Sequence, residues 1–505
     1  MQVAPDFETF AAGYRAGQAC LLRATLVADL ETPVAAFLKL RHQRQGAAFL
    51  LESVEGGAVR GRYSMIGLDP DLVWRCRDGA VELSREPPGR EPRFVPNERP
   101  PLDSLRALIV ESAIPVEPDL PPMAAGLFGY LGYDMVRLME RLPPPNPDAL
   151  GVPDAILVRP TVMVVFDAVR DEISLVTPVR PQASVSAKAA YETALTRLDD
   201  VAGALERPLP IEEQHDPAFV AEPPVSNTTD AEYKSMVAQA QEYIRAGDVF
   251  QVVLSQRFQA PFRLPPFSLY RALRRVNPAP FLCYLDFESF QIVCSSPEIL
   301  VRVREGAVTI RPIAGTRPRG ETPAEDRRLG EELLADPKER AEHLMLLDLG
   351  RNDVGRVSAL GTVKVTDSFF LERYSQVMHI VSNVEGRLES RFDALGALVA
   401  GFQAGTVSGA PKVRAMEIID ELEKDKRGPY AGCIGYFGAN GEMDTCIVLR
   451  TAVVKDGRMF VQAGAGIVYD SDPEAEQQEC INKAKALFRA AEEAVRFASR
   501  AGRGQ

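Results

Sequence analysis

The first half of the chain alternates between hydrophobic runs of strand-like and helix-like period. Alternating or continuously apolar runs predict strands at 20–27, 47–53, 62–67, 72–76, 156–167 and 172–177. Apolar positions three and four residues apart predict helices at 6–15, 31–40 and 187–205. The apolar run at 124–134 predicts one more strand, whose glycines allow another backbone to pack close. Proline-rich stretches at 86–101 and 142–147 predict surface segments.

The second half opens after a segment with little periodicity. Residues 207–228 are rich in Pro, Glu and Asp and predict a linker between an N-terminal domain at 1–206 and a second domain at 229–498. Thr229 and Glu232 fit a capping box, and the helix they open is predicted to end at Gly247. Strands are predicted to dominate 249–310. Further helices are predicted at 325–334, 337–349, 392–402, 412–423 and 473–497.

Strand and helix runs are interleaved without regular alternation, and no repeat of 20–50 residues is evident. This pattern favours an α/β (α+β) fold over a barrel. We expect a large multi-layer sandwich of mixed or antiparallel sheets, flanked by helices.

The stretch from 450 to 483 carries the densest chemistry. It predicts a strand, a glycine corner at Gly464–Ala465–Gly466, a polar hairpin, and a helix. Glu476, Glu479 and Lys483 would share one face of that helix. Backbone N–H groups, two carboxylates and one ammonium together suit a negatively charged small molecule bridged by a metal ion.

Composition and charge narrow the function classes. The net charge of −12 argues against a nucleic-acid or anionic-membrane surface, so any anion site must be built locally. No apolar run approaches the roughly 18–20 residues that span a bilayer. The N-terminus lacks a signal peptide pattern, and none of the seven cysteines forms a C-x-x-C pair. We therefore expect a cytoplasmic enzyme with reduced, mostly buried thiols.

Carboxylates are better candidates for metal ligands than histidines, since the chain has only four histidines. Glu339 and Glu342 lie three residues apart on one predicted helix, as do Glu476 and Glu479 on another. Two such helices could each give one carboxylate to Mg²⁺, a hard cation that prefers oxygen ligands. The loop at 405–412 runs into a helix and could bind a carboxylate through its N–H groups.

Five motifs occur in the order found in the chorismate-utilising enzymes. They are Pro-Ile-Ala-Gly-Thr-Arg at 312–317, Glu-His-Leu-Met at 342–345, Arg-Asn-Asp at 351–353, Gly-Thr-Val-Ser-Gly-Ala-Pro at 405–411 and Gln-Ala-Gly-Ala-Gly-Ile-Val at 462–468. Within that group the chain most resembles the component I family of anthranilate synthases. The resemblance is dense from 249 to 489 and thinner in the N-terminal half. It implies the chorismate-utilising enzyme fold.

The resemblance also implies roles for individual residues. Glu298 matches the general acid for loss of the C4 hydroxyl, which requires a raised pKa, and His379 and Thr406 match catalytic-site residues. Mg²⁺ would be held by Glu342 and Glu479, with Glu339 and Glu476 supporting them. The implied substrate site comprises Gln251, Gly315, Thr316, Tyr430, Arg450, Gly464, Ala465, Gly466 and Lys483.

The residues at two positions distinguish among the reactions that these enzymes catalyse. Relatives that form isochorismate carry a lysine base where this chain has Gln251, which cannot act as a base near neutral pH. Aminodeoxychorismate synthases that use a covalent lysine carry it where this chain has Ala314. Ammonia as the nucleophile then points to synthesis of anthranilate and pyruvate, the first step of tryptophan biosynthesis. An aminodeoxyisochorismate or aminodeoxychorismate synthase and a non-catalytic paralogue are the alternatives.

The resemblance implies two further partners. The chain has no cysteine elbow of the glutaminase type, so a separate glutamine amidotransferase subunit would deliver ammonia. Two segments, at 50–53 and 277–281, resemble those that form a feedback site for L-tryptophan. Its predicted residues are Ser53, Pro280, Phe281 and Leu282. The chain departs from the usual Ser-Pro-Tyr of the second segment, because it has Ala-Pro-Phe at 279–281.

Overall fold

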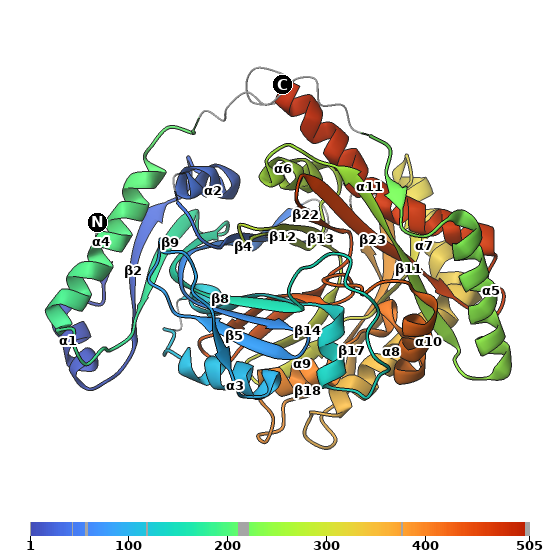
Figure 1. Cartoon of the computed structure of the whole chain (residues 1–505), viewed down its shortest axis with the longest axis horizontal. Coiled ribbons are helices and arrows are strands. Elements are labelled where there is room, and N and C mark those ends of the chain that lie inside the picture. The colour runs from blue at the N-terminus through green and yellow to red at the C-terminus, as the bar shows by residue number, and fades with distance from the viewer. Residues whose placement is uncertain are drawn as a thin grey trace.

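The computed structural model describes residues 2–42, 44–55, 59–117, 120–210, 222–374 and 377–499. The middle of the predicted linker, at 211–221, lies outside the described residues. In the described chain every recorded strand pairing is antiparallel, and the strands form one continuous hydrogen-bonded network. Helices cover its outer faces, which confirms the expected sandwich (Figure 1).

The strands fall at the following bounds. In the N-terminal part they are β1 (Val3–Ala4), β2 (Cys20–Val27), β3 (Ala48–Glu55), β4 (Val59–Arg77), β5 (Ala80–Ser84), β6 (Val95–Asn97), β7 (Gly126–Leu131), β8 (Ala155–Asp167), β9 (Glu172–Val179) and β10 (Val225–Ser226). The later strands are β11 (Gln251–Pro261), β12 (Phe281–Asp286), β13 (Gln291–Ser296), β14 (Ile299–Arg304), β15 (Ala307–Ile310), β16 (Ile313–Pro318), β17 (Lys364–Arg373), β18 (Val377–Arg387), β19 (Gly409–Ala410), β20 (Cys433–Gly438), β21 (Met443–Ile447), β22 (Thr451–Lys455) and β23 (Arg458–Ile467).

The helices have these bounds. They are α1 (Phe7–Arg15), α2 (Pro33–Arg41), α3 (Pro101–Glu111), α4 (Ala187–Leu205), α5 (Asp230–Ala246), α6 (Pro266–Val276), α7 (Pro323–Ala335), α8 (Pro337–Gly355), α9 (Ala394–Gly401), α10 (Lys412–Leu422) and α11 (Pro473–Ser499). Short 3-10 turns are η1 (Pro122–Ala124), η2 (Tyr133–Leu138) and η3 (Gly405–Val407).

Local sequence signals explain most helix starts. Asp6, Thr32, Ser186 and Thr322 each accept a backbone hydrogen bond as N-cap residues. The predicted capping box at Thr229 is present, and α5 ends at a left-handed glycine as expected. Helices α3 and α6 were not predicted. In both, a proline occupies the N-cap position and no side chain caps the helix, so the usual start signal is missing.

The prediction of two separate strands at 62–67 and 72–76 was wrong. The segments 62–67 and 72–76 belong to a single long strand, β4, which pairs with β8 along its length. The register shifts between Pro70 and Leu72, and Asp69 has a positive φ of 53°. The apparent break in the hydrophobic pattern is therefore a bulge, which bends a strand without ending it.

The glycines of β7 do allow close packing. A Cβ atom at Gly129 would lie 2.0 Å from the carbonyl oxygen of Ile156, and one at Gly126 would lie 2.1 Å from that of Phe437. These contacts join β7 to β8 on one side and to β20 on the other. This confirms the expectation of close backbone approach at 124–134.

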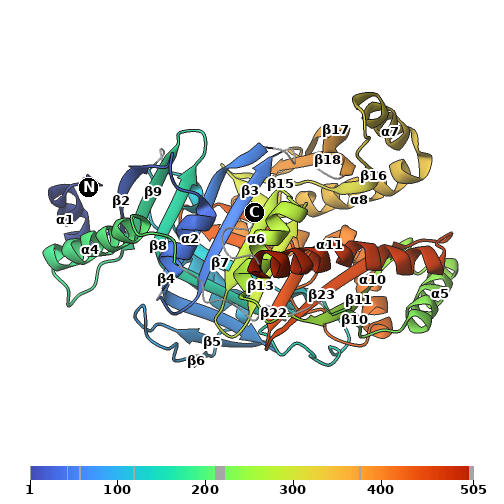
Figure 2. The ribbon, with the colours of Figure 1, turned by 90° about the horizontal axis from the view of Figure 1, so that it is seen from above.

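Strands from the two halves of the sequence pair with one another. β3 pairs with β12, and β7 pairs with β20. Figure 2 shows strands of the first half, among them β3 and β7, next to elements of the second half. Three hydrophobic clusters contain residues from both sides of 207–228: one between the sheet layers and two beneath the helices. Along the described chain, none of the helices combines the length and apolar character needed to cross a membrane.

Candidate active site

The carboxyl group of Glu298 is buried just after the end of β13. Its Oε1 atom accepts hydrogen bonds from the Thr406 hydroxyl at 3.0 Å and from the Ile313 N–H at 3.4 Å. Burial raises the pKa of Glu298 to about 8, although both hydrogen bonds and the charge of Arg450 oppose this. The carboxyl group is therefore mostly protonated at neutral pH, as a general acid requires.

His379 lies on β18 next to the strand β16. Its Nδ1 atom is 2.8 Å from the carbonyl oxygen of Gly315, so Nδ1 must carry the proton it donates; the same atom lies 3.1 Å from the Thr316 hydroxyl. Burial, with the charges of Arg450 and Lys483, lowers the pKa of His379 to about 4. The ring is neutral at pH 7, and its Nε2 atom is left as a proton acceptor.

Tyr374 is a neighbour of His379 that sequence reasoning missed. The two rings lie 5.6 Å apart, and the Tyr374 hydroxyl donates to Glu372 at 2.9 Å. Burial and the charge of Glu372 raise the pKa of this phenol. Tyr374 directly follows β17 and lies outside the five motifs. Only its position beside His379 in the fold marks it as part of the site.

Arg450 and Tyr430 lie in connections that lead into the strands β22 and β20, respectively. Arg450 adopts a left-handed φ of 47° in the short connection before β22. Its guanidinium forms no hydrogen bond or ion pair with any residue that the structure describes. Such a group is available for bidentate capture of a carboxylate.

The predicted glycine corner is instead part of a straight strand. Gly464 and Gly466 lie within β23, which pairs with β11 through Ser255 and Val253. A Cβ atom at Gly464 would lie 3.1 Å from the Tyr430 hydroxyl, and one at Gly466 would lie 2.6 Å from the Gln251 amide. The glycines therefore make room for these neighbouring side chains. Ala465, between them, is buried.

Carboxylates from α8 and α11 face one another, as the sequence predicted. Burial raises the pKa of Glu342, and the charges of Glu339 and Glu479 raise it further. The amide of Gln251 donates to Glu342 at 3.2 Å. Lys483 pairs with Glu479 at 2.7 Å and also donates to the carbonyl oxygen of Gly464 at 2.9 Å. α11 is therefore held against β23 with its acidic face toward α8.

Glu476 extends this acidic group. Burial raises its pKa, and the charge of Glu479 adds to the effect. Glu339 is instead neutralised by Arg317 at 2.9 Å. Mutual repulsion among these carboxylates would be relieved by a divalent cation, so the donor set fits a hard metal ion.

The loop at 405–412 positions Thr406 rather than exposing a row of N–H groups. Its residues Gly409–Ala410 form β19, which pairs with the start of β11. Pro411 precedes α10 as its N-cap residue. The chemical contribution that the structure shows is the Thr406 hydroxyl on Glu298.

Arg427 is a second residue that sequence reasoning missed. Its guanidinium donates to Glu423 at 2.6 and 2.9 Å and to the carbonyl oxygens of Val407 and Val253, each at 2.7 Å. The ring of Tyr430 lies 5.6 Å away. Burial works against its charge, but Glu423 holds the pKa of Arg427 above its ordinary value. The spacing of four residues between Glu423 and Arg427 is the sequence pattern that could have predicted this ion pair.

The two segments of the predicted tryptophan site meet in the sheet. Ser53 on β3 is paired with Phe281 on β12, and Leu282 is paired with Glu52. Pro280 directly precedes β12. Glu52, which was not predicted, is buried and accepts hydrogen bonds from Arg274 at 2.7 and 2.9 Å. On its other side Phe281 is paired with Ser296, two residues before Glu298.

Comparison with known proteins places this site in a family. A family model described as chorismate binding enzyme matches residues 55–489. The chain is 57% identical over 499 residues to anthranilate synthase component 1 of Cereibacter sphaeroides, covering 99% of this chain and 100% of that protein. It is 48% identical over 472 residues to the same component of Thermus thermophilus, covering 93% and 97%.

Solved structures agree. Anthranilate synthase component I from Streptococcus pneumoniae superposes with a TM-score of 0.75 at 37% identity, covering 92% of this chain and 99% of that chain. The menaquinone-specific isochorismate synthase of Escherichia coli, at 19% identity, superposes with a TM-score of 0.70 over 96% of this chain and 100% of that chain, and it shares the fold.

Proposed function

The chain belongs to the chorismate binding enzyme family, and from this premise we propose that it is the large subunit of an anthranilate synthase. The reaction is chorismate plus ammonia to anthranilate, pyruvate and water. Ammonia forms a bond to C2 of the ring while the C4 hydroxyl leaves. Loss of the C2 proton and the enolpyruvyl group then gives the aromatic product.

The observation that carries this proposal is the buried acid Glu298, with its pKa of about 8. A hydroxyl leaves as water only if it receives a proton, and at neutral pH Glu298 holds one to give. The Thr406 hydroxyl, at 3.0 Å, orients the carboxyl group. An exposed glutamate would be ionised and could not fill this role.

His379 supplies the complementary base. Its neutral ring holds a proton on Nδ1, through the carbonyl oxygen of Gly315, and leaves Nε2 free to accept the C2 proton. The low pKa of about 4 makes it a weak base. Aromatisation of the ring provides the driving force for this step.

The remaining substrate residues anchor the carboxylates of chorismate. Arg450 lacks a partner among the described residues and can bind a carboxylate in a bidentate manner. Tyr430 adds a hydroxyl beside Gly464. Thr316 and Gly315 lie against His379 and would back the ring.

Glu342 and Glu479 would hold Mg²⁺, with Glu339 and Glu476 beside them. When bound, the ion would bind the ring carboxylate of the substrate and neutralise the charge of the acidic group. Gln251 and Lys483 keep the two ligands oriented, through the 3.2 Å and 2.7 Å contacts described above.

Ammonia would come from a glutamine amidotransferase subunit. Glutamine hydrolysis of this kind needs an accessible thiolate. All of the cysteines are free, and all except Cys20 are buried. Burial also raises the pKa of Cys20. Free thiols of this kind fit the reducing cytoplasm.

L-tryptophan would bind where Ser53 faces Phe281, with Pro280 and Leu282 alongside. Phe281 is paired with Ser296, which lies two residues before Glu298. A displacement of Phe281 on tryptophan binding would therefore be passed to Glu298 through Ser296. Residues 1–206 would then contribute Ser53 to the regulatory site, and 229–498 would contribute Pro280, Phe281 and Leu282 together with the chemistry.

The variant Glu298→Gln tests the observation that carries the proposal. It keeps the size and the hydrogen bond from Thr406 but has no proton of suitable acidity to give. We expect kcat with chorismate and ammonium to fall by about 10²–10⁴-fold. The dissociation constant for chorismate should stay within a few fold of wild type. Wild-type turnover in the variant would overturn the assignment of the acid.

A further inference from the structure

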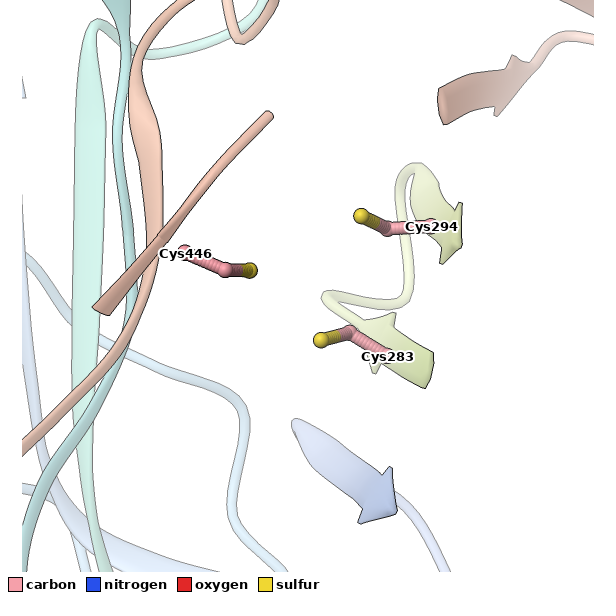
Figure 3. Close-up of side chains that lie close together, drawn as sticks. All are labelled: Cys283, Cys294 and Cys446. Carbon is pink, nitrogen blue, oxygen red and sulfur yellow. The ribbon is translucent and has the colours of Figure 1, made fainter. Parts of the chain in front are cut away.

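Three cysteines meet inside the sandwich, and none of them is among the predicted site residues. Cys283 on β12, Cys294 on β13 and Cys446 on β21 come from both sheet layers, and their side chains converge (Figure 3). Their residues are 4%, 0% and 1% exposed. None forms a disulfide. The remaining four cysteines lie outside this group, which we call the thiol cluster.

The geometry of the thiol cluster suits one ion. Its three sulfur atoms all lie within 4.8 Å of one another. An ion bound at about 2.3 Å by three sulfurs in a plane separates those sulfurs by about 4.0 Å. The sulfurs therefore need to move by less than about 1 Å, which is within the reach of small side-chain rotations.

We propose that Cys283, Cys294 and Cys446 form a three-thiolate binding site for a single soft cation of the copper(I) class. Thiolates favour soft metal ions, and copper(I) accepts three sulfur ligands. Structural zinc sites instead require four ligands. Among the described residues no histidine or carboxylate joins the three sulfurs as a fourth ligand.

Binding would exchange protons for the ion. Hydrogen bonds within the cluster raise the pKa of Cys283 and of Cys446, and hydrogen bonds from both of these residues lower the pKa of Cys294. Written from three neutral thiols, the balanced step is Cu⁺ + 3 RSH → [Cu(SR)₃]²⁻ + 3 H⁺. No electron is transferred, and the released protons go to solvent.

The thiol cluster lies directly behind the substrate site. Cys294 is paired with Thr451, the residue after Arg450, and its thiol donates to the carbonyl oxygen of Leu449 at 3.7 Å. Burial lowers the pKa of Arg450, and negative charge on Cys294 is one of the contributions that oppose this. An occupied cluster would place negative charge behind this guanidinium. The positive charge of Arg450 would then be partly compensated by the complex, and Arg450 would bind a substrate carboxylate more weakly.

The test is an anaerobic titration of the full chain against copper(I) supplied as its coloured bicinchoninate complex. We expect the chain to withdraw one equivalent of copper, with a new thiolate-to-copper absorption in the ultraviolet. The KM for chorismate should rise several-fold in the loaded protein while kcat changes less. The variant Cys446→Ala should bind copper at least about tenfold more weakly and keep its KM when copper is added.

Cys433→Ala is the matched control, since Cys433 is equally buried on β20 but lies outside the thiol cluster. It should bind copper as wild type does. Thermal unfolding of both variants without copper checks that each is folded. If wild type withdraws no copper, or if both variants weaken binding equally, the site does not exist. If zinc displaces copper from it, the assigned class of ion is wrong. None of these outcomes would bear on the proposed anthranilate synthesis, which is measured with the copper-free chain.

Discussion

At the scale of single residues, burial shifts the pKa values of Glu298 and His379 in opposite directions. The same water-excluded environment that raises the pKa of Glu298 to about 8 lowers that of His379 to about 4. Between these values the carboxyl group holds its proton and the imidazole does not. One environment thereby prepares both a donor and an acceptor for the two proton transfers that the reaction needs.

This arrangement predicts a bell-shaped pH profile. The measured quantity is kcat/KM for chorismate at a fixed concentration of free ammonia, which reports groups of the free enzyme. The rate should fall above pH about 8, because Glu298 loses its proton, and below pH about 4, because His379 gains one. The fall at high pH should be absent from the residual activity of Glu298→Gln. A rate that keeps rising well above pH 8 would show that the acid is another group.

At the scale of elements, one buried ion pair holds together the segments that carry the site. Arg427 joins α10, through Glu423, to the carbonyl oxygens of Val407 and Val253. Val407 follows the Thr406 that contacts Glu298, and Val253 lies opposite Gly466. The position of Glu298, the proposed general acid, therefore depends on Arg427, which does not itself contact the carboxyl group of Glu298.

Arg427→Met should destabilise the fold by about 3–5 kcal/mol, because it leaves Glu423 buried without its partner. The double variant Arg427→Met with Glu423→Met removes both charges and should recover part of that loss. Denaturant unfolding measures both. As a control, Arg328→Met breaks an exposed pair with Glu332 and should change stability by less than about 1 kcal/mol. Equal losses for the two single variants would contradict the role given to the buried pair.

A second element-scale prediction concerns the ladder from β3 through β12 to β13. Ser53→Arg places a long charged side chain opposite Phe281. Tryptophan should then inhibit at least about tenfold more weakly, with kcat/KM for chorismate within about twofold of wild type. Thr25→Arg, on the exposed side of β2, adds the same charge elsewhere and should leave inhibition intact. Unchanged inhibition in Ser53→Arg would place the feedback site elsewhere.

At the scale of the whole molecule, the sequence predicted the elements better than their partners. Capped helices such as α4 and α5 were found at their expected bounds, because their signals are local. α6 was missed, since it lies in a strand-rich region and lacks a side-chain cap. The pairing of β7 with β20 across about 300 residues follows from no local pattern. It arises from packing between the two halves.

The candidate site shows the same limit. Glu342 and Glu479 were found on opposed helices by their spacing and the resemblance, and the raised pKa of Glu342 agrees with that proximity. Arg427 and Tyr374 were missed, because each acts through neighbours that only the fold brings close. The glycine corner was misread, since glycine in a strand and glycine in a turn look alike without their cross-strand neighbours.

The central claim is that this chain converts chorismate to anthranilate. The most direct measurement mixes the purified chain with chorismate, Mg²⁺ and ammonium at alkaline pH, without glutamine, and identifies the products by mass and fluorescence. The account predicts anthranilate and pyruvate in equal amounts, abolished by chelation of the metal and restored by adding Mg²⁺. An amino product that retains the enolpyruvyl group, or turnover that survives chelation, would contradict it.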